Sequence, residues 1–166
     1  MKVMSEKRIH LLKTDKILEI ISWVFLLGIW LITIISFQTL PDKIPTHFNF
    51  EGIADNFGGK NEIFTLPVIA TILTIGLTIL NKYLNSSNNL GERNNSENLY
   101  IRTRIIKFLK IAILVIFGMI IFHTVEIAKN ESEGLGRWLL IMTILLTNIP
   151  TLYYLNKLRV IKSTKK

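Results

Sequence analysis

Four long blocks of apolar residues constrain this chain more than any other feature of its sequence. Hydrophobic residues make up 49% of the 166 residues, and they fall in blocks rather than at amphipathic spacing. A water-soluble domain of this size has too little interior to bury four such blocks, because much of a small fold's surface stays in contact with water. The lipid bilayer accepts them, so the sequence predicts an integral membrane protein.

The first block, residues 17–37, is the clearest of the four. Its 21 residues would span roughly 31 Å as a helix. Fourteen of them are Leu, Ile, Val or Phe, and together these contribute roughly −4 to −8 kcal/mol to membrane insertion. Glu19 costs at most about 3 kcal/mol, so the block is predicted to span the membrane. It is longer than a signal-peptide core and lacks a small-residue cleavage site, so we expect it to be retained.

Three further spans are predicted at residues 64–80, 105–125 and 138–155. Pro67 lies in the first turn of the second span, where its missing N–H does little harm. Together the four spans predict an all-α integral membrane protein that forms one membrane domain over residues 1–166. Homo-oligomerisation is left open.

Three charged side chains lie within the predicted spans, close to their ends. Lys107 and Lys110 can extend their stems and keep their ammonium groups at the membrane interface. Glu19 lies only two residues into the first span, so we expect it to be interfacial as well. Helix packing explains the threonine stripe of the second span, which consists of Thr71, Thr74 and Thr78.

Lysine and arginine residues are distributed unevenly between the loops. Sixteen of the 20 lie before the first block, from Lys82 to Lys110, or from Lys157 onward, and four lie in the two remaining loops. The positive-inside rule therefore places both termini and the middle loop in the cytoplasm. The net charge of +8 indicates this topology and a contact with membrane lipids. No groove-reading motif accompanies the charge, so nucleic acid is not an expected partner.

The two longest loops differ in composition. The middle loop, residues 85–98, reads NSSNNLGERNNSEN and has a single leucine as its only apolar side chain. Such a segment cannot bury a core and is predicted to be a disordered cytoplasmic linker. Cysteine is absent from the chain, which excludes disulfides and thiolate sites.

The first outer loop, residues 38–62, is instead predicted to be an ordered extracytoplasmic cap. It contains too many apolar side chains for a solvated tether, and its prolines and glycines favour turns. If residues 46–50 are extended, Phe48 and Phe50 lie on one side, over the helix ends or the lipid interface. Asp55 and Asn56 can close an Asx turn.

The cap carries a motif with eleven matching positions: Leu40, Pro41, Asp42, Ile44, Pro45, His47, Phe48, Gly52, Asp55, Gly58 and Lys60. This spacing resembles the domain of unknown function 1648 family, the N-terminal module of SdpI-type immunity membrane proteins. Residues 131–138, ESEGLGRW, resemble that family's third loop, whereas Phe57 stands where the family often has Trp. The resemblance implies a non-enzymatic protein of the bacterial cytoplasmic membrane. It also implies immunity or a stress response against a membrane-active toxic peptide, together with retention of a cytoplasmic regulator.

Four polar residues of the cap are the predicted binding site: His47, Asn49, Asp55 and Lys60. They could form a recognition surface for a peptide or a lipid headgroup. The alternative is that they hydrogen-bond the backbone of the cap and hold its turns. No catalytic residue, metal or cofactor is predicted.

Two other functions stay open at this stage. A small proton-coupled transporter acting as a dimer would use Glu19 as its membrane carboxylate. A membrane metal-dependent hydrolase would need imidazole and carboxylate ligands. His123 and Glu126 share a helix face near the outer end of the third span, and His47 could join them from the cap.

Overall fold

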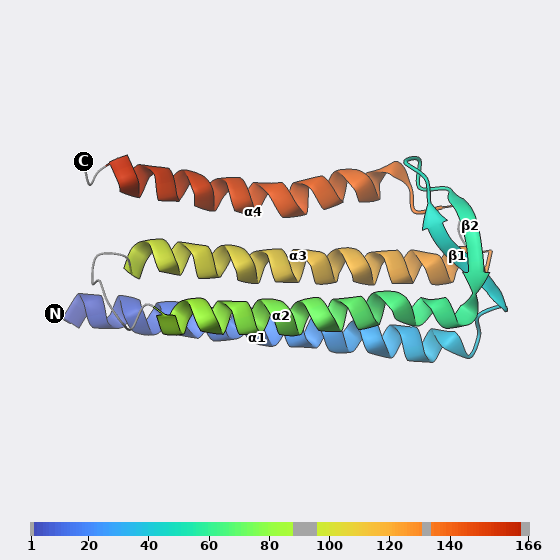
Figure 1. Cartoon of the computed structure of the whole chain (residues 1–166), viewed down its shortest axis with the longest axis horizontal. Coiled ribbons are helices and arrows are strands. Elements are labelled where there is room, and N and C mark those ends of the chain that lie inside the picture. Colours follow the sequence, from blue (N-terminus) through green and yellow to red (C-terminus); the bar gives the residue numbers. More distant parts are fainter. Residues whose placement is uncertain (1, 88–95, 131–133, 164–166) are drawn as a thin grey trace.

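The computed structural model describes residues 2–87, 96–130 and 134–163. Four helices run alongside one another, and a two-stranded hairpin lies across one end of them (Figure 1). The helices are α1 (Lys2–Phe37), α2 (Thr65–Ser87), α3 (Ser96–Ala128) and α4 (Arg137–Ser163). Helix α3 is central, because α1, α2 and α4 all pack against it.

Each helix contains a stretch that is long and apolar enough to cross a membrane. These stretches are Thr14–Phe37, Lys60–Leu84, Ile101–Ala128 and Arg137–Lys157. The prediction of four helices able to span a membrane is therefore confirmed at the level of length and composition. Many large apolar side chains of α1, α2 and α4 are exposed, as expected of lipid-facing surfaces, whereas those of the central helix α3 are mostly buried or half-buried.

Helical structure extends into both ends of the predicted linker, residues 85–98. Helix α2 continues to Ser87, and α3 already begins at Ser96. At these two ends the structure therefore differs from the predicted disorder, because helical hydrogen bonding continues beyond the apolar blocks. The rest of the linker lies outside the described residues.

Helix α1 ends where its sequence stops supporting a helix. After Phe37 the chain turns, and both the backbone N–H and the hydroxyl of Thr39 donate to the Ser36 carbonyl, at 2.9 and 3.0 Å. Pro41 follows, and proline disfavours helical backbone in the residue before it. The chain then enters the hairpin instead of returning directly into α2.

The hairpin consists of β1 (Lys43–Phe48) and β2 (Ala54–Gly59), paired antiparallel. A short 3-10 helix, η1 (Lys60–Phe64), joins it to α2. The register shifts on either side of His47, with Thr46 as the extra residue on β1 and Asp55 on β2. Such bulges bend a strand and redirect its side chains. The loop predicted as a cap is thus built on strands within an otherwise helical fold.

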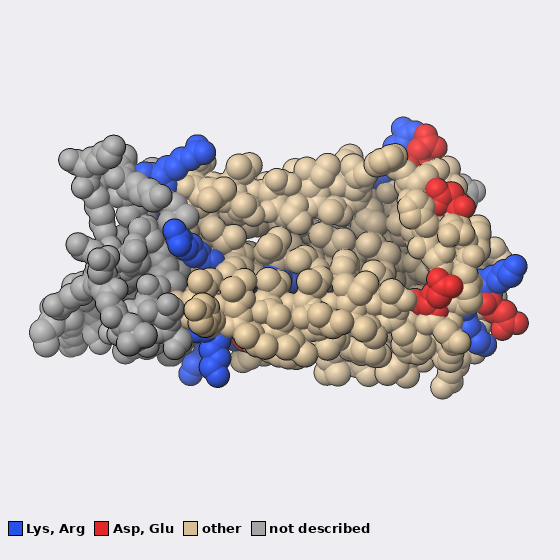
Figure 2. All heavy atoms as spheres, viewed as in Figure 1, with Lys and Arg blue, Asp and Glu red and all other residues tan. Residues whose placement is uncertain are grey.

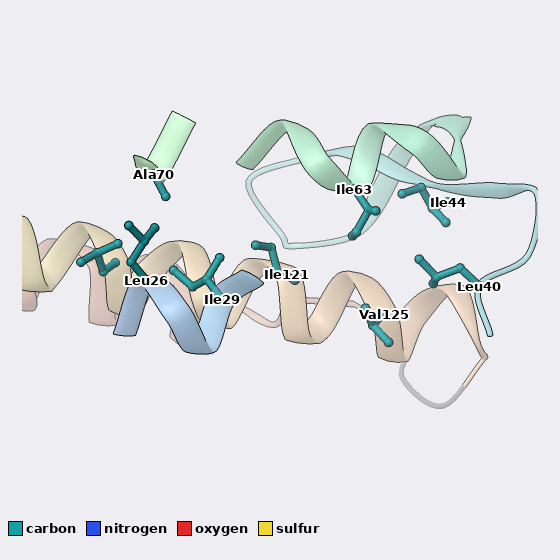
Figure 3. Close-up of a cluster of buried hydrophobic side chains, with 9 residues drawn as sticks. Leu26, Ile29, Leu40, Ile44, Ile63, Ala70, Ile121 and Val125 are labelled. Atoms are coloured by element: carbon teal, nitrogen blue, oxygen red, sulfur yellow. The ribbon is translucent and has the colours of Figure 1, made fainter. Parts of the chain in front are cut away.

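The cap, defined here as residues 38–62, packs on the bundle through a shared apolar cluster. Its Leu40 and Ile44 are buried together with side chains of α1, η1 and α3 (Figure 3). Ile44 is only 1% exposed. Burial of a side chain of this size contributes roughly 1.5–3 kcal/mol, so apolar burial anchors the hairpin to the helices.

Phenylalanine does not anchor the cap in the way the alternation predicts. Phe48 is half-buried, but Phe50 is 91% exposed. The reason is that β1 ends at Phe48, so Phe50 lies in the turn and leaves the strand alternation. The first of the two predicted placements, over the helix ends, is therefore wrong for Phe50, whereas its placement at the lipid interface stays a prediction. Ile44 is the buried side chain that anchors the cap to the helices.

Candidate functional site

His47 and Asp55 form a pair on the outer surface of the hairpin. The Nδ1 atom of His47 lies 2.6 Å from Oδ1 of Asp55, and the two side chains are largely exposed. The two bulges bring them together, because each residue adjoins a shift in register. The structure thus gathers two of the four predicted site residues into one polar group that faces away from the helices.

Asn49 closes the turn of the hairpin. Its side-chain oxygen accepts hydrogen bonds from the backbone N–H groups of Glu51 and Ile53, at 2.9 and 3.0 Å. The prediction of an Asx turn at Asp55 and Asn56 is therefore wrong, because both residues belong to β2, and it is Asn49 that forms an Asx-type turn. Asn49 therefore holds the backbone of the turn, as the structural alternative for this residue predicts.

Lys60 ties the two ends of the hairpin together. Its backbone N–H donates to the Asp42 carbonyl at 3.0 Å, and its ammonium lies 3.5 Å from the Asp42 carboxylate. The same ammonium lies 5.6 Å from the centre of the Phe37 ring, within the range of a cation–π contact. Lys60 has internal partners on both sides, so its contacts also fit the structural alternative.

The tip of the hairpin docks against the segment that leads into α4. The carbonyl of Gly52 accepts from the Leu135 N–H at 2.8 Å, and Glu51 pairs with Arg137 at 3.2 Å. Gly52 has a φ of +80°, and a Cβ there would lie 2.8 Å from the Gly136 nitrogen. Glycine is needed at this position both for the conformation and for the close approach of two backbones. The cap thus reaches from α1 and α2 to the start of α4.

Three large apolar side chains of the cap remain exposed: Phe50, Ile53 and Phe57. They lie in the turn or on β2, whose residues are exposed or only partly buried. The cap therefore exposes three large apolar side chains as well as the His47–Asp55 pair. These five exposed residues are named here the cap surface.

The three-ligand metal set that the hydrolase alternative would need is not brought together. His47 pairs with Asp55, whereas His123 pairs with Glu126 at 2.9 Å within α3. The His123 ring also packs edge-on against Trp138 of α4. Among the residues that the structure describes, no group of three His, Cys, Asp or Glu could hold a metal ion.

A buried polar group inside the bundle was missed by the sequence reasoning. The Lys110 ammonium lies 2.6 Å from the Glu19 carboxylate and donates to the Thr78 hydroxyl at 3.0 Å. The Thr78 hydroxyl in turn donates to Glu19 at 2.9 Å. These three residues, named here the buried triad, come from α3, α1 and α2. Lys110 is only 2% exposed, so the prediction that its ammonium lies at the interface is wrong.

The interface prediction fails because an internal partner is available. A lysine inside a span normally extends its charge toward water. Here the carboxylate and the hydroxyl of two neighbouring helices stabilise the ammonium directly. The sequence did contain a signal for this contact, because Thr78 belongs to the threonine stripe that was explained by helix packing. Another member of that stripe, Thr71, accepts a hydrogen bond from the Trp30 indole at 3.0 Å, which supports the packing interpretation there.

A second group of charges, named here the charged rim, lies next to the triad toward the ends of the spans. It consists of Asp15 on α1 and of Arg104 and Lys107 on α3. One oxygen of Asp15 lies 3.6 Å from the Arg104 Nε and 3.3 Å from the Lys107 ammonium. The Lys107 ammonium also donates to the Asp15 carbonyl at 3.4 Å. Lys107 is largely buried, so it too departs from the predicted interfacial position.

The helices and the cap together define a candidate multi-pass membrane module with a folded hairpin at one end. Residues 24–71 match the family model described as Domain of unknown function (DUF1648), so the resemblance to this family is confirmed over this segment, and its link to SdpI-type immunity proteins stays a prediction. The match covers the C-terminal part of α1, the cap and the start of α2. The residues compared with the family's third loop, 131–138, lie outside it.

One relative from a known organism also matches part of the chain. An uncharacterized protein of Archaeoglobus fulgidus is 30% identical to this chain over 78 residues, which cover 42% of this chain and 43% of the relative. The match thus spans less than half of the relative's length. No solved structure matches the chain.

Proposed function

We propose that this chain is a non-enzymatic module of the bacterial cytoplasmic membrane, with both termini in the cytoplasm and the cap outside. The four candidate spans support a multi-pass arrangement. Figure 2 supports the orientation, because the described end opposite the cap carries mostly Lys and Arg, whereas the cap end carries both signs. Positive charge is favoured on the cytoplasmic side of a membrane protein.

The cap surface is proposed to bind a membrane-active peptide, as in an SdpI-like immunity or stress-response protein. The observation that carries this proposal is the exposure of Phe50, Ile53 and Phe57 on an element that is otherwise folded and anchored. Large apolar side chains that a folded element leaves exposed are available to pack against a partner. A membrane-active peptide offers a complementary apolar face, and the His47–Asp55 pair adds a polar contact. A cytoplasmic regulator bound by the basic termini is the alternative partner.

Resistance of a sensitive bacterial strain to a panel of membrane-active peptides tests the proposal. Expression of the chain should confer resistance to at least one peptide, and Phe50→Ser, His47→Ala or Asp55→Ala should remove it. The matched control is Thr46→Ala, an exposed position on β1 outside the cap surface. Equal membrane levels of every variant must be shown by immunoblotting. If no peptide of the panel is resisted, the immunity role should be abandoned.

The orientation has its own test because the chain contains no cysteine. Single cysteines can be introduced as Phe50→Cys in the cap and Lys157→Cys at the end of α4, both at exposed positions. A membrane-impermeant maleimide should label the first in intact spheroplasts and the second only after permeabilisation. The reverse pattern would place the cap in the cytoplasm.

A proton-coupled transporter acting as a dimer is the second candidate. The buried triad favours it, because Glu19 pairs inside the bundle, where an ionisable group of a transporter would lie. Glu19→Gln would then abolish substrate-driven proton movement in reconstituted vesicles. Unchanged proton flux would exclude this mechanism while leaving the peptide-binding proposal intact.

A further inference from the structure

An exposed amide side chain, that of Asn148, lies on the outward face of α4. This helix has one extensive helix contact, with α3, and lies at the edge of the bundle (Figure 1). Its buried side chains Leu139 and Tyr154 mark the side that packs on α3, where the Tyr154 ring contacts Phe108. At 3.6 residues per turn, Asn148 lies about 180° round the helix from Leu139 and about 120° from Tyr154. The amide therefore points away from α3.

Asn148 also lies in the middle of its candidate span. The span begins at Arg137, 11 positions earlier, and ends at Lys157, nine positions later. At the rise of an α-helix, the amide is roughly 13–17 Å from either end. The hydrocarbon at this depth offers neither water nor any other hydrogen-bonding group, so the amide depends on protein partners.

Its own helix satisfies the nitrogen of this amide but not the oxygen. The Nδ2 atom of Asn148 donates to the Ile144 carbonyl at 2.8 Å and to the Thr147 hydroxyl at 3.2 Å. The Thr147 hydroxyl is itself used as a donor to the Thr143 carbonyl, at 2.7 Å. Among the residues that the structure describes, none donates a hydrogen bond to Oδ1 of Asn148. An amide oxygen left without a donor in hydrocarbon is costly.

Large apolar side chains surround Asn148 on the same helix face. Four of them, spaced three or four positions apart and 42 to 58% exposed, are Ile141, Ile144, Leu152 and Leu155. Such spacing lets one helix pack against another along a single seam. A lone asparagine at a central position of such a seam specifies the register and the number of helices in a coiled coil. This face therefore has the pattern of a helix contact.

A second copy of the chain supplies what the amide lacks. Copies inserted in one orientation bring their Asn148 residues to the same depth, and a two-fold axis makes the two amides face each other. Each amide contains both donors and an acceptor. Each can keep its bond to the Ile144 carbonyl and exchange the longer contact with Thr147 for the oxygen of the partner's Asn148. Both oxygens then gain an N–H donor, and no other group is required.

We propose that α4 is the contact of a parallel homodimer in which the two Asn148 side chains hydrogen-bond each other across the two-fold axis. Polar side chains join membrane helices in this way because lipid cannot satisfy them. The dimer requires that the helices cross a membrane, and it is independent of what the cap binds. It also gives an interface to the dimer that the transporter candidate would need, without depending on transport.

Energy transfer between labelled full-length chains in phosphatidylethanolamine–phosphatidylglycerol vesicles measures the association. Donor or acceptor dyes can be attached to Lys157→Cys, because the chain contains no cysteine. Asn148→Leu should raise the dissociation constant about tenfold, as expected for the loss of two interhelical hydrogen bonds, whereas Asn148→Gln should retain most of the association. Thr143→Val is the matched control, because the Thr143 hydroxyl donates within its own helix, to the Leu139 carbonyl at 2.8 Å.

Cysteine cross-linking in the same vesicles identifies the face. On oxidation, Ile141→Cys should form a disulfide between two copies, whereas Ile72→Cys, on the exposed face of α2, should not. An unchanged dissociation constant in Asn148→Leu, or equal cross-linking at the two positions, would overturn the proposal. If Asn148→Leu does not fold, the comparison of Ile141→Cys with Ile72→Cys decides. Labelled chains that stay apart at every protein-to-lipid ratio would exclude a second copy as the partner of this face.

Discussion

The predicted site residues of the cap and the buried triad are held by polar contacts of different range. In the cap, His47 and Asp55 are eight positions apart, and Asn49 bonds a backbone group four positions away. In the buried triad, Lys110 reaches Glu19 across 91 positions, and Thr78 reaches it across 59. Local turns and bulges thus arrange His47, Asn49 and Asp55, whereas helix packing assembles the triad.

This difference separates two kinds of site. The cap surface is exposed, so changes there should alter recognition more than stability. The triad is enclosed by three helices, so changes there should alter stability first. The family model matches only one of these two sites, because residues 24–71 include the cap but none of the triad.

Removing one member of the triad should have the largest effect. Lys110→Met leaves the Glu19 carboxylate among the helices without its closest cation. Loss of one partner from a buried ion pair costs about 3–5 kcal/mol. Because Glu19 is 27% exposed, we expect the lower end of this range. Unfolding of the purified protein, followed by circular dichroism during a denaturant titration, measures the change.

The double variant Glu19→Gln/Lys110→Met is the matched comparison for this prediction. Removing both charges leaves no ion unpaired, so most of the lost stability should return. If Lys110→Met alone were as stable as the unmodified protein, the triad would not hold the helices together. The cap surface and the triad would then not differ in their contribution to stability.

Gly52→Ala should have an intermediate effect, confined to the cap. Alanine is strained at a φ of +80°, and its Cβ would lie 2.8 Å from the Gly136 nitrogen. The left-handed conformation alone costs about 1–2 kcal/mol. The tip should therefore separate from the segment before α4 and become easier to cleave by protease. Gly59→Ala is the control, because its φ is −70° and a Cβ there meets nothing within 4 Å. Equal cleavage of the two variants would contradict the docking of the tip.

The architecture could be predicted from the sequence wherever one segment determines its own structure. Blocks such as residues 17–37 are long and apolar enough to indicate a span without knowledge of any neighbour. The cap was recognised as folded from its prolines, glycines and apolar side chains. Its strands were not assigned, because two bulges within a six-residue pairing disrupt the alternation that would reveal them.

The triad could not be predicted because it depends on which helix faces Lys110. From the sequence alone, a lysine five residues into the predicted span 105–125 is best explained by extension toward the interface. Only packing of α1 and α2 on α3 brings Glu19 and Thr78 to it. The Gly52 contact was missed for the same reason, since its partner Gly136 lies 84 positions away.

His47→Ala should have the smallest effect on stability. The His47–Asp55 pair is exposed, with 67 and 44% of its side chains accessible, and exposed pairs contribute about 0–1 kcal/mol. The denaturant midpoint should therefore change little, and Asp55→Ala should behave in the same way. If these variants stay folded but lose peptide resistance, the cap surface acts in recognition. A stability loss as large as that of Lys110→Met would instead show that the pair holds the hairpin. The cap surface and the buried triad would then no longer differ in their contribution to stability.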